Sequence, residues 1–298
     1  MPRRCGVVNS PPPNTRSEPV QTVIRAAELR SLLAAARGAG RRIGFVPTMG
    51  NLHAGHQSLI SLARERSDLV VASVFVNPTQ FGPSEDFSRY PRTPEADAAA
   101  LAAQGCDVMF LPAVDELYPH GAENAVRIHV PGLSETLEGA IRPGHFDGVA
   151  TVCAALFNLV QPDLAVFGQK DYQQLLVIRR LVADLSFPIE VLAAPIVREP
   201  SGLAMSSRNQ YLDPDQRERA AAIFATLGWM RDEAQAGRAA ADIEQGALLR
   251  LESAGLRPDY AVIRRADDLA EAGAGDGPRV ALVAARLGST RLIDNQLL

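Results

Sequence analysis

The sequence predicts an α/β protein in which a Rossmann-like parallel sheet with helices on both faces is followed by a smaller α+β C-terminal domain. Apolar runs of strand length alternate with helical patterns through the first part of the chain, which is the order of βαβ units. The run Leu69–Val76 is almost continuously apolar, as in a parallel strand covered on both faces. After residue 212 two helical patterns precede two strand patterns, so we expect a second, smaller fold there.

The first elements are predicted from composition and spacing. Residues 1–20 are rich in Pro, Ser and Arg and lack periodicity, so we expect a disordered extension. Leu and Ala then recur at helical spacing up to Gly38, which predicts a first helix. The elements predicted up to residue 105 are a helix over Thr22–Arg37, a strand over Ile43–Val46, a helix from Gly55 to Arg66, the strand Leu69–Val76 and a helix from Thr93 to Gly105.

The remaining elements complete the sheet and form the second domain. Residues 83–94 are polar and irregular, so a mobile loop over a site and a plain connector both fit. We place the domains at residues 21–200 and 201–298. In the rest of the first domain the predicted elements are strands over Val108–Leu111, Val126–Val130, Asp163–Phe167 and Ile196–Arg198 and helices over Leu133–Leu137, Val149–Val160 and Tyr172–Leu185. In the second domain they are helices over Asp213–Ala236 and Asp242–Ala254, strands over Asp259–Arg264 and Val280–Ala285, and a loop at Gly273–Gly277.

Composition excludes several classes of protein. A net charge of −4 and a pI near 5.8 argue against a nucleic-acid surface. Three scattered cysteines form neither a disulfide framework nor a metal knuckle. A proline run stands where a signal peptide would have an apolar segment, and no stretch is long enough to span a membrane. We therefore expect a cytoplasmic protein without nucleic-acid or membrane partners.

The stretch Val46–His56 is the corner around which we expect the site to form. A strand end, a turn with glycines and two histidines at the start of a helix are found there. Free backbone N–H groups and the positive end of the helix dipole can bind an anion at such a corner, and neutral imidazole can donate to phosphate oxygens. Capping or surface histidines are the plain alternative. A zinc site is disfavoured because the Glu of HExxH and a third ligand are missing.

Other polar residues follow later strands and could join this corner. Asn77 and Gln80 follow Leu69–Val76, although they could equally only shape a turn. Lys170 opens a helix after the strand ending at Phe167, where its charge opposes the helix dipole, which favours a phosphate contact. Neither GxGxxG at a helix start nor GxxxxGK[ST] occurs. The HxGH turn with the distant Met205–Arg208 stretch resembles the signatures of the nucleotidylyl-transferase superfamily.

The order of the longer motifs resembles that of the pantothenate synthetase (pantoate–β-alanine ligase) family over roughly residues 22–295. The motifs are PTMGNLHAGH, SVFVNPTQF, YPRT, RPGHFDGV, FGQKDYQQL, VREPSGLAMSSRN and ARLGSTRLIDN. The resemblance implies ATP-dependent condensation of (R)-pantoate with β-alanine through pantoyl adenylate, releasing AMP and pyrophosphate. It also implies Mg²⁺ and a homodimer.

The resemblance also implies roles for individual residues. His56, His53 and Lys170 are the catalytic candidates, with His56 as the family's proton donor. Gln80 would contact both pantoate and β-alanine, and Gln174 would contact pantoate. Asn77 and Arg142 match secondary polar positions in the pocket, and Asp97 could help to hold Mg²⁺. The ATP-binding candidates are Met49, Gly50, Asn51, Leu52, His53, Ala54, Gly55, His56, Gly168, Gln169, Lys170, Asp171, Val197, Met205, Ser206, Ser207 and Arg208.

Two other functions share part of this pattern. A nucleotidylyl transferase acting on a phosphate acceptor would have the HxGH corner but no need for Gln80 and Gln174. A non-catalytic nucleotide-binding regulator would keep the glycine turn but would have no use for two histidines and Lys170 converging. The family's frequent Glu or Met is replaced by Gln169 here, which leaves the partner of that side chain open.

Overall fold

The computed structural model describes residues 19–83, 85, 87–273 and 277–298, so almost all of the expected extension over residues 1–20 lies outside the described residues. The first sheet has six strands in the order β1-β4-β3-β2-β5-β6, and every neighbouring pair is parallel. The strands are β1 (Gln21–Val23), β2 (Ile43–Thr48), β3 (Leu69–Val74), β4 (Val108–Phe110), β5 (Leu164–Gly168) and β6 (Glu190–Ala194).

The strand order places a switch point between β2 and β5. From β2 the chain moves outward through β3 to β4, and it then returns to the other side of β2 to form β5 and β6. In open α/β sheets, ligands bind outside the carboxyl ends of the strands where the order reverses. The carboxyl ends of β2 and β5 carry the HxGH turn and Lys170 respectively, so the fold brings the two motifs to one crevice.

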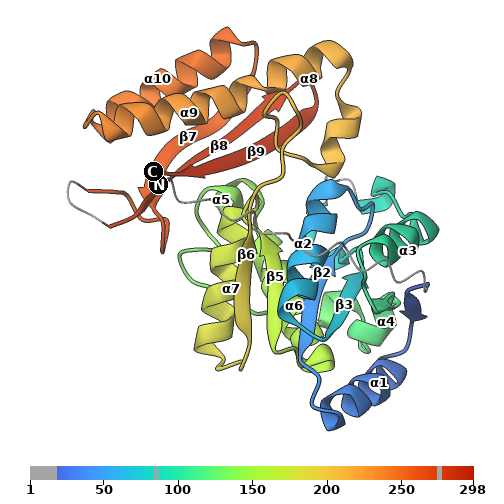
Figure 1. Cartoon of the computed structure of the whole chain (residues 1–298). Helices are drawn as coiled ribbons and strands as arrows, with labels where there is room; N and C mark the ends of the chain where they lie inside the picture. The colour runs from blue at the N-terminus through green and yellow to red at the C-terminus, as the bar shows by residue number, and fades with distance from the viewer. Residues whose placement is uncertain (1–18, 84, 86, 274–276) are drawn as a thin grey trace, which may run out of the picture.

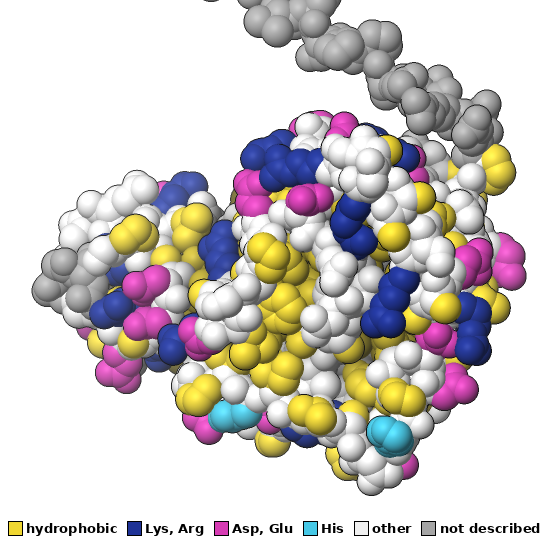
Figure 2. Space-filling view, turned by 90° about the horizontal axis from the view of Figure 1, so that it is seen from below, with side chains coloured by type: hydrophobic (Ala, Val, Ile, Leu, Met, Phe, Trp, Pro, Cys, Tyr) yellow, Lys and Arg dark blue, Asp and Glu magenta, His cyan; other side chains and the backbone are white. Residues whose placement is uncertain are grey.

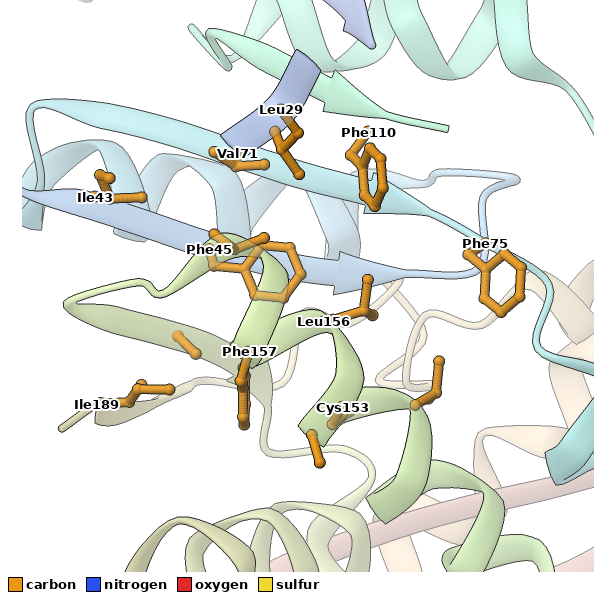
Figure 3. Packing of buried hydrophobic residues seen from close by; sticks show 14 of the residues in the cluster. Leu29, Ile43, Phe45, Val71, Phe75, Phe110, Cys153, Leu156, Phe157 and Ile189 are labelled. Atoms are coloured by element: carbon orange, nitrogen blue, oxygen red, sulfur yellow. The ribbon is translucent and has the colours of Figure 1, made fainter. Parts of the chain in front are cut away.

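Helices cover both faces of this sheet, as the apolar strand runs require. Leu29 of α1, Phe157 of α6 and Ile178 of α7 pack on one face, and Ile60 of α2 and Leu101 of α3 pack on the other. Figure 3 shows Phe45 of β2 pointing toward Phe157, with ring centroids 6.3 Å apart. The helices are α1 (Ala26–Gly38), α2 (Ala54–Arg66), α3 (Pro94–Ala103), α4 (Val114–Leu117), α5 (Glu138–Ile141), α6 (His145–Val160) and α7 (Tyr172–Asp184), with short 3₁₀ turns η1 (Pro78–Gln80), η2 (Phe87–Arg89) and η3 (Ala122–Asn124).

The C-terminal part forms a second sheet with its own apolar core. Its strands β7, β8 and β9 are antiparallel and consecutive, and Figure 1 shows α9 and α10 on the side of this sheet away from the first sheet. The elements are η4 (Ser207–Tyr211), α8 (Pro214–Ala220), α9 (Ala222–Gln235), α10 (Ala240–Ser253), β7 (Arg257–Arg265), β8 (Arg279–Leu287) and β9 (Thr290–Leu297). The predicted fold class is confirmed.

Three predictions about the elements of the first domain were wrong. Gln21–Val23 is a strand that pairs with β4, so α1 begins later than predicted. The segment 126–130 forms no strand, and the backbone N–H of Ile128 donates instead to Thr151 Oγ1 at 2.9 Å. The short helix is Glu138–Ile141 rather than the stretch before it, because Leu137 has a positive φ of 45°.

Three further predictions failed nearer the C-terminus. The last parallel strand is Glu190–Ala194, since Pro195 has no N–H with which to continue the ladder. The long helix predicted after residue 213 is divided at Ala221. The strand β9 was missed because polar residues interrupt its apolar alternation. Residues 274–276 of the predicted glycine loop lie outside the described residues.

The surface agrees with the modest net charge. On the face in Figure 2, basic and acidic side chains are interspersed rather than separated by sign. Within the part of the chain that the structure describes, no helix has the length and apolar character needed to cross a membrane.

Candidate active site

A cavity lies at the carboxyl ends of β2 and β5, and most of the predicted site residues line it. Both histidines, Lys170, Gln80 and Gln174 are among them. The other predicted residues that line the cavity are Met49, Gly55, Asn77, Arg142, Gly168, Asp171, Val197, Met205, Ser206, Ser207 and Arg208. The lining does not include the predicted residues Gly50, Asn51, Leu52, Ala54, Asp97 and Gln169.

The two histidines cap α2 reciprocally. His53 is the N-cap residue, and its Nδ1 accepts the N–H of Gly55 at 3.1 Å. The Nδ1 of His56 accepts the N–H of His53 at 3.3 Å, and the two ring centroids are 4.1 Å apart. Since both Nδ1 atoms are acceptors, each neutral ring carries its proton on Nε2. The two histidines therefore cap the helix, as the plain alternative expected, and also line the cavity.

The protonation state of these rings follows from their surroundings. Burial lowers the pKa of His53 to about 4, and the charge of Lys170 adds to this shift. Burial, together with the electrostatic effect of the neighbouring His53 ring, lowers the pKa of His56 to about 3. Both rings are neutral at pH 7, so they can donate hydrogen bonds to developing negative charge but hold no imidazolium proton to transfer.

Glycine is required within the histidine turn. A Cβ atom at Gly55 would lie 2.8 Å from Cε1 and 2.9 Å from Nδ1 of His53. Gly50 has a φ of +82°, and a Cβ there would lie 2.8 Å from Oδ2 of Asp97. The glycines therefore let the backbone close around the imidazole on one side and the Asp97 carboxylate on the other.

Asp97 holds this turn from behind. Its side chain is buried, its Oδ1 accepts the N–H of Leu52 at 2.8 Å, and its Oδ2 accepts the N–H of Asn51 at 3.1 Å. Thr93 Oγ1 donates to the same Oδ2. Both oxygens therefore accept hydrogen bonds from the turn or from Thr93, and Asp97 is not among the residues that line the cavity, so its position does not favour a direct contact with Mg²⁺. Within residues 19–83, 85, 87–273 and 277–298 there is no group of three His, Cys, Asp or Glu side chains that could hold a metal ion.

A buried amide network forms part of the cavity wall. Gln80 Nε2 contacts Met49 Sδ at 3.1 Å, and Gln80 Oε1 accepts from Asn77 Nδ2 at 3.0 Å. Tyr118 donates its hydroxyl to Asn77 Oδ1 at 2.8 Å. No motif pointed to Tyr118, which reaches this network from a loop more than 40 residues away in the chain.

Arg142 belongs to an ion pair at the cavity rim. Its Nε and Nη2 donate to the two carboxylate oxygens of Glu85 at 2.6 and 2.9 Å. Its Nη1 faces His145 Nε2 at 3.0 Å, so His145 Nδ1–H donates to the carbonyl of Gln80 at 2.9 Å. Burial lowers the pKa of His145 to about 4. His145 lies in the RPGHFDGV motif but was not singled out, and Glu85 carried no sequence signal.

The Met205–Arg208 stretch and the end of β5 complete the cavity. Ser207 Oγ donates to the carbonyl of Asn51 at 3.4 Å, which ties this stretch to the histidine turn. Lys170 is the chain's only lysine, its side chain is 20% exposed, and its ammonium lies 3.8 Å from Asp171 Oδ1. Adjacent glutamines of α7 differ in role, because Gln173 hydrogen-bonds to backbone atoms outside the cavity whereas Gln174 lines it.

Known proteins resemble this chain over most of its length. The model of the pantoate-beta-alanine ligase family matches residues 21–297. The chain belongs to that family. It is 60% identical over 278 residues to the pantothenate synthetase of Xylella fastidiosa (strain M12), covering 93% of this chain and 99% of the relative. It is 59% identical over 276 residues to that of Stenotrophomonas maltophilia (strain K279a), with the same coverage of each chain.

Solved structures of the pantoate-beta-alanine ligase family agree with the fold. The pantothenate synthetase of Thermus thermophilus superimposes with a TM-score of 0.87 at 48% identity, covering 93% of this chain and 99% of that one. A pantoate-beta-alanine ligase from Francisella tularensis, complexed with beta-gamma ATP and beta-alanine, superimposes with a TM-score of 0.78 at 33% identity, covering 93% and 97%. The family predicted from the motifs is confirmed.

Proposed function

We propose that this chain condenses (R)-pantoate with β-alanine, using ATP, through a pantoyl-adenylate intermediate. The observation that carries the proposal is the convergence of His53, His56, Lys170, Gln80 and Gln174 on one cavity at the switch point of the sheet. Membership of the pantoate-beta-alanine ligase family supports it, as does the Francisella tularensis complex with beta-gamma ATP and beta-alanine.

The reaction needs two displacements. A pantoate carboxylate oxygen forms a bond to the α-phosphorus of ATP, and the bond to the β-phosphate oxygen breaks to release pyrophosphate. The amine of β-alanine then forms the amide bond at the acyl carbon, the acyl–oxygen bond to AMP breaks, and the amine gives up a proton to the medium. Both steps depend on positioning and on stabilisation of charge that develops on oxygen.

The site residues divide between these tasks. We assign Lys170 and the Nε2–H groups of His53 and His56 to the phosphates, where they stabilise the negative charge of the departing pyrophosphate. The family's label of proton donor for His56 becomes hydrogen-bond donor here, because its pKa of about 3 leaves the ring neutral. The residues from Met205 to Arg208 and Val197 would hold ATP from the opposite side.

The amides are assigned to the organic acids. A carboxylate accepts hydrogen bonds, and Gln80 presents an amide N–H₂ that contacts the weak acceptor Met49 Sδ in this structure. Pantoate can replace that contact. Gln174 would bind pantoate beside it, Gln80 would also contact β-alanine, and Asn77 would hold Gln80 in place.

Several expectations are carried forward as parts of the proposal. Mg²⁺ in nucleotide sites keeps several waters and binds phosphate oxygens, so it would enter with ATP rather than through Asp97, which holds the histidine turn and does not line the cavity. A homodimer and a cytoplasmic location also remain proposals. We place the domain boundary between residues 200 and 201, supported by the separate apolar core that forms after it.

An exchange assay tests the proposed function. The chain should exchange labelled pyrophosphate into ATP when pantoate is present and β-alanine is absent, because adenylation is reversible. Full turnover should require β-alanine and produce AMP. Exchange that does not depend on pantoate, or release of ADP, would reject the proposal and would favour a nucleotidylyl transferase or an acyl-phosphate enzyme instead.

A further inference from the structure

The C-terminal strand β9 contacts the segment that carries Lys170 through the side-chain amide of Asn295. Asn295 is 2% exposed, and its Nδ2 donates to the backbone carbonyls of Gln169 and Lys170, at 2.9 Å in each case. Gln169 Nε2 lies 3.4 Å from Asn295 Oδ1, which supplies the side-chain partner that the sequence left open. One side chain of the second domain is therefore bonded to the peptide carbonyls on both sides of the Lys170 Cα atom.

These carbonyls lie where the sheet can no longer pair them. The parallel ladder between β5 and β6 ends at Gly168 and Ala194, and the N–H of Gln169 still donates to the carbonyl of Ala194. Beyond that point a buried carbonyl needs another donor, and leaving it without one costs about 1–3 kcal/mol. The two N–H groups of one primary amide satisfy two successive carbonyls and so fix the local direction of the chain.

The neighbouring residue ties β9 to the other strand that ends at the cavity. Asp294 forms a two-pronged ion pair with Arg198, with N–O distances of 2.6 and 3.1 Å. Asp294 Oδ1 also accepts the N–H of Asn295 at 2.8 Å. Arg198 follows the cavity residue Val197 and stacks on the Phe224 ring with its Cζ 4.1 Å from the centroid. Two consecutive residues of β9 thus bind the segments that follow β5 and β6.

We propose that Asn295 is a positioning residue for the adenylation step, acting through the backbone of Lys170. A flexible lysine side chain has many rotamers, so the direction of its first bond decides how often its ammonium meets the triphosphate. Asn295 fixes that direction from outside the cavity. This inference rests on the proposed function, and it gives the last strand of the chain a part in the chemistry of the first domain.

The variant Asn295→Ala tests the proposal by a double-mutant cycle. Loss of two hydrogen bonds to buried carbonyls should lower pantoate-dependent ATP–pyrophosphate exchange by about 10-fold or more. In a Lys170→Ala background the same substitution should change the residual exchange less than about 2-fold, because the group it positions is gone. Asn124→Ala is the matched control, since its amide also donates to a backbone carbonyl but on the exposed surface.

A spectroscopic readout separates positioning from general damage. Because Lys170 is the only lysine, reductive ¹³C-methylation places one side-chain NMR reporter in the protein, distinct from that of the α-amino group. The wild-type reporter should shift on adding β,γ-methylene ATP, and the shift should be reduced in Asn295→Ala. Asn295→Ser, which keeps one donor, should fall between them and serves if the alanine variant does not fold.

The outcomes distinguish the alternatives. Equal losses in both backgrounds of the cycle, or an unchanged reporter shift together with a lowered melting temperature, would show that Asn295 only docks the second domain and would overturn the inference. Normal exchange in a folded Asn295→Ala variant would also overturn it. Absence of pantoate-dependent exchange in the wild type would instead reject the proposed function, and the reporter shift would still test the link to Lys170.

Discussion

Gly55→Ala should separate catalytic geometry from stability in the histidine turn. The added Cβ would lie 2.8 and 2.9 Å from two atoms of the His53 ring, where 3.4 Å is the start of ordinary contact. The ring must therefore move by roughly half an ångström or more, and the 3.1 Å bond from the Gly55 N–H to Nδ1 is strained or lost. Since a misplacement on the order of 1 Å can cost about 10²-fold, we expect exchange to fall about 10- to 100-fold.

The same substitution should change the stability of the fold little. Gly55 lies in the first turn of α2 and is not among the glycines with positive φ, so alanine should favour the helix by up to about 1 kcal/mol, which offsets much of the roughly 0.5–2 kcal/mol that a weakened helix cap costs. Gly228→Ala in α9 is the matched control, because no atom lies within 4 Å of its added Cβ. Both variants should melt at or near the wild-type temperature, and only Gly55→Ala should lose activity.

Pantoate-dependent exchange and thermal melting are the two assays for this pair. A Gly55→Ala variant that is folded and retains wild-type exchange would refute the claim that the position of the His53 ring matters. A loss of exchange that follows a fall in melting temperature would show that the substitution acts through the fold.

Four further results follow from the same geometry. Lys170→Ala and His53→Ala should each lower exchange by about 10²-fold, as expected for loss of preorganised charge stabilisation; wild-type rates in both would place the site elsewhere. In the fold the pKa values of His53 and His56 are about 4 and 3, whereas both are near 6.5 in the unfolded chain. Between pH 6.5 and 4 the unfolded chain therefore binds more protons, so the free energy of unfolding measured in urea should fall as the pH drops through that window. A free energy of unfolding that does not change with pH there would contradict the prediction. Tyr118→Phe removes the 2.8 Å hydrogen bond to Asn77, a loss of about 1 kcal/mol, and should therefore raise the KM for pantoate several-fold with little change in the KM for ATP. Equal changes in both KM values would argue against a role for Tyr118 in binding pantoate. Phe157→Ala empties a fully buried position beside Phe45 and should lower the free energy of unfolding by about 3–5 kcal/mol, which urea titration measures; a change below about 1 kcal/mol would contradict the packing.

Local chemistry was sufficient to predict much of the first domain. The apolar run of β3 and the helical spacing of α2 carry their structure in their own residues, and their predicted bounds differ little from Leu69–Val74 and Ala54–Arg66. The motifs also predicted that the histidines and Lys170 line one cavity. These features depend on periodicity and on the position of polar residues at strand ends, both of which are visible in a single sequence.

Features set by distant partners could not be predicted in this way. The strand β1 exists because it pairs with β4 more than 80 residues away, whereas the segment 126–130 forms no strand because no strand among the described residues pairs with it. Asp97 has the chemistry of a metal ligand in the sequence, yet its oxygens accept two backbone N–H groups of the histidine turn. Asn295 lay in a recognised motif, but only the packing of β9 against the end of β5 gives it a role.

The fate of the carboxylate oxygen tests the central claim most directly. With pantoate labelled with ¹⁸O in both carboxylate positions, attack on the α-phosphorus followed by aminolysis should leave one ¹⁸O atom in the phosphate of AMP and one in the amide carbonyl of pantothenate. Mass spectrometry of the AMP formed in a full turnover measures this. AMP without label, or label in inorganic phosphate with ADP as the co-product, would contradict a pantoyl adenylate formed in this cavity.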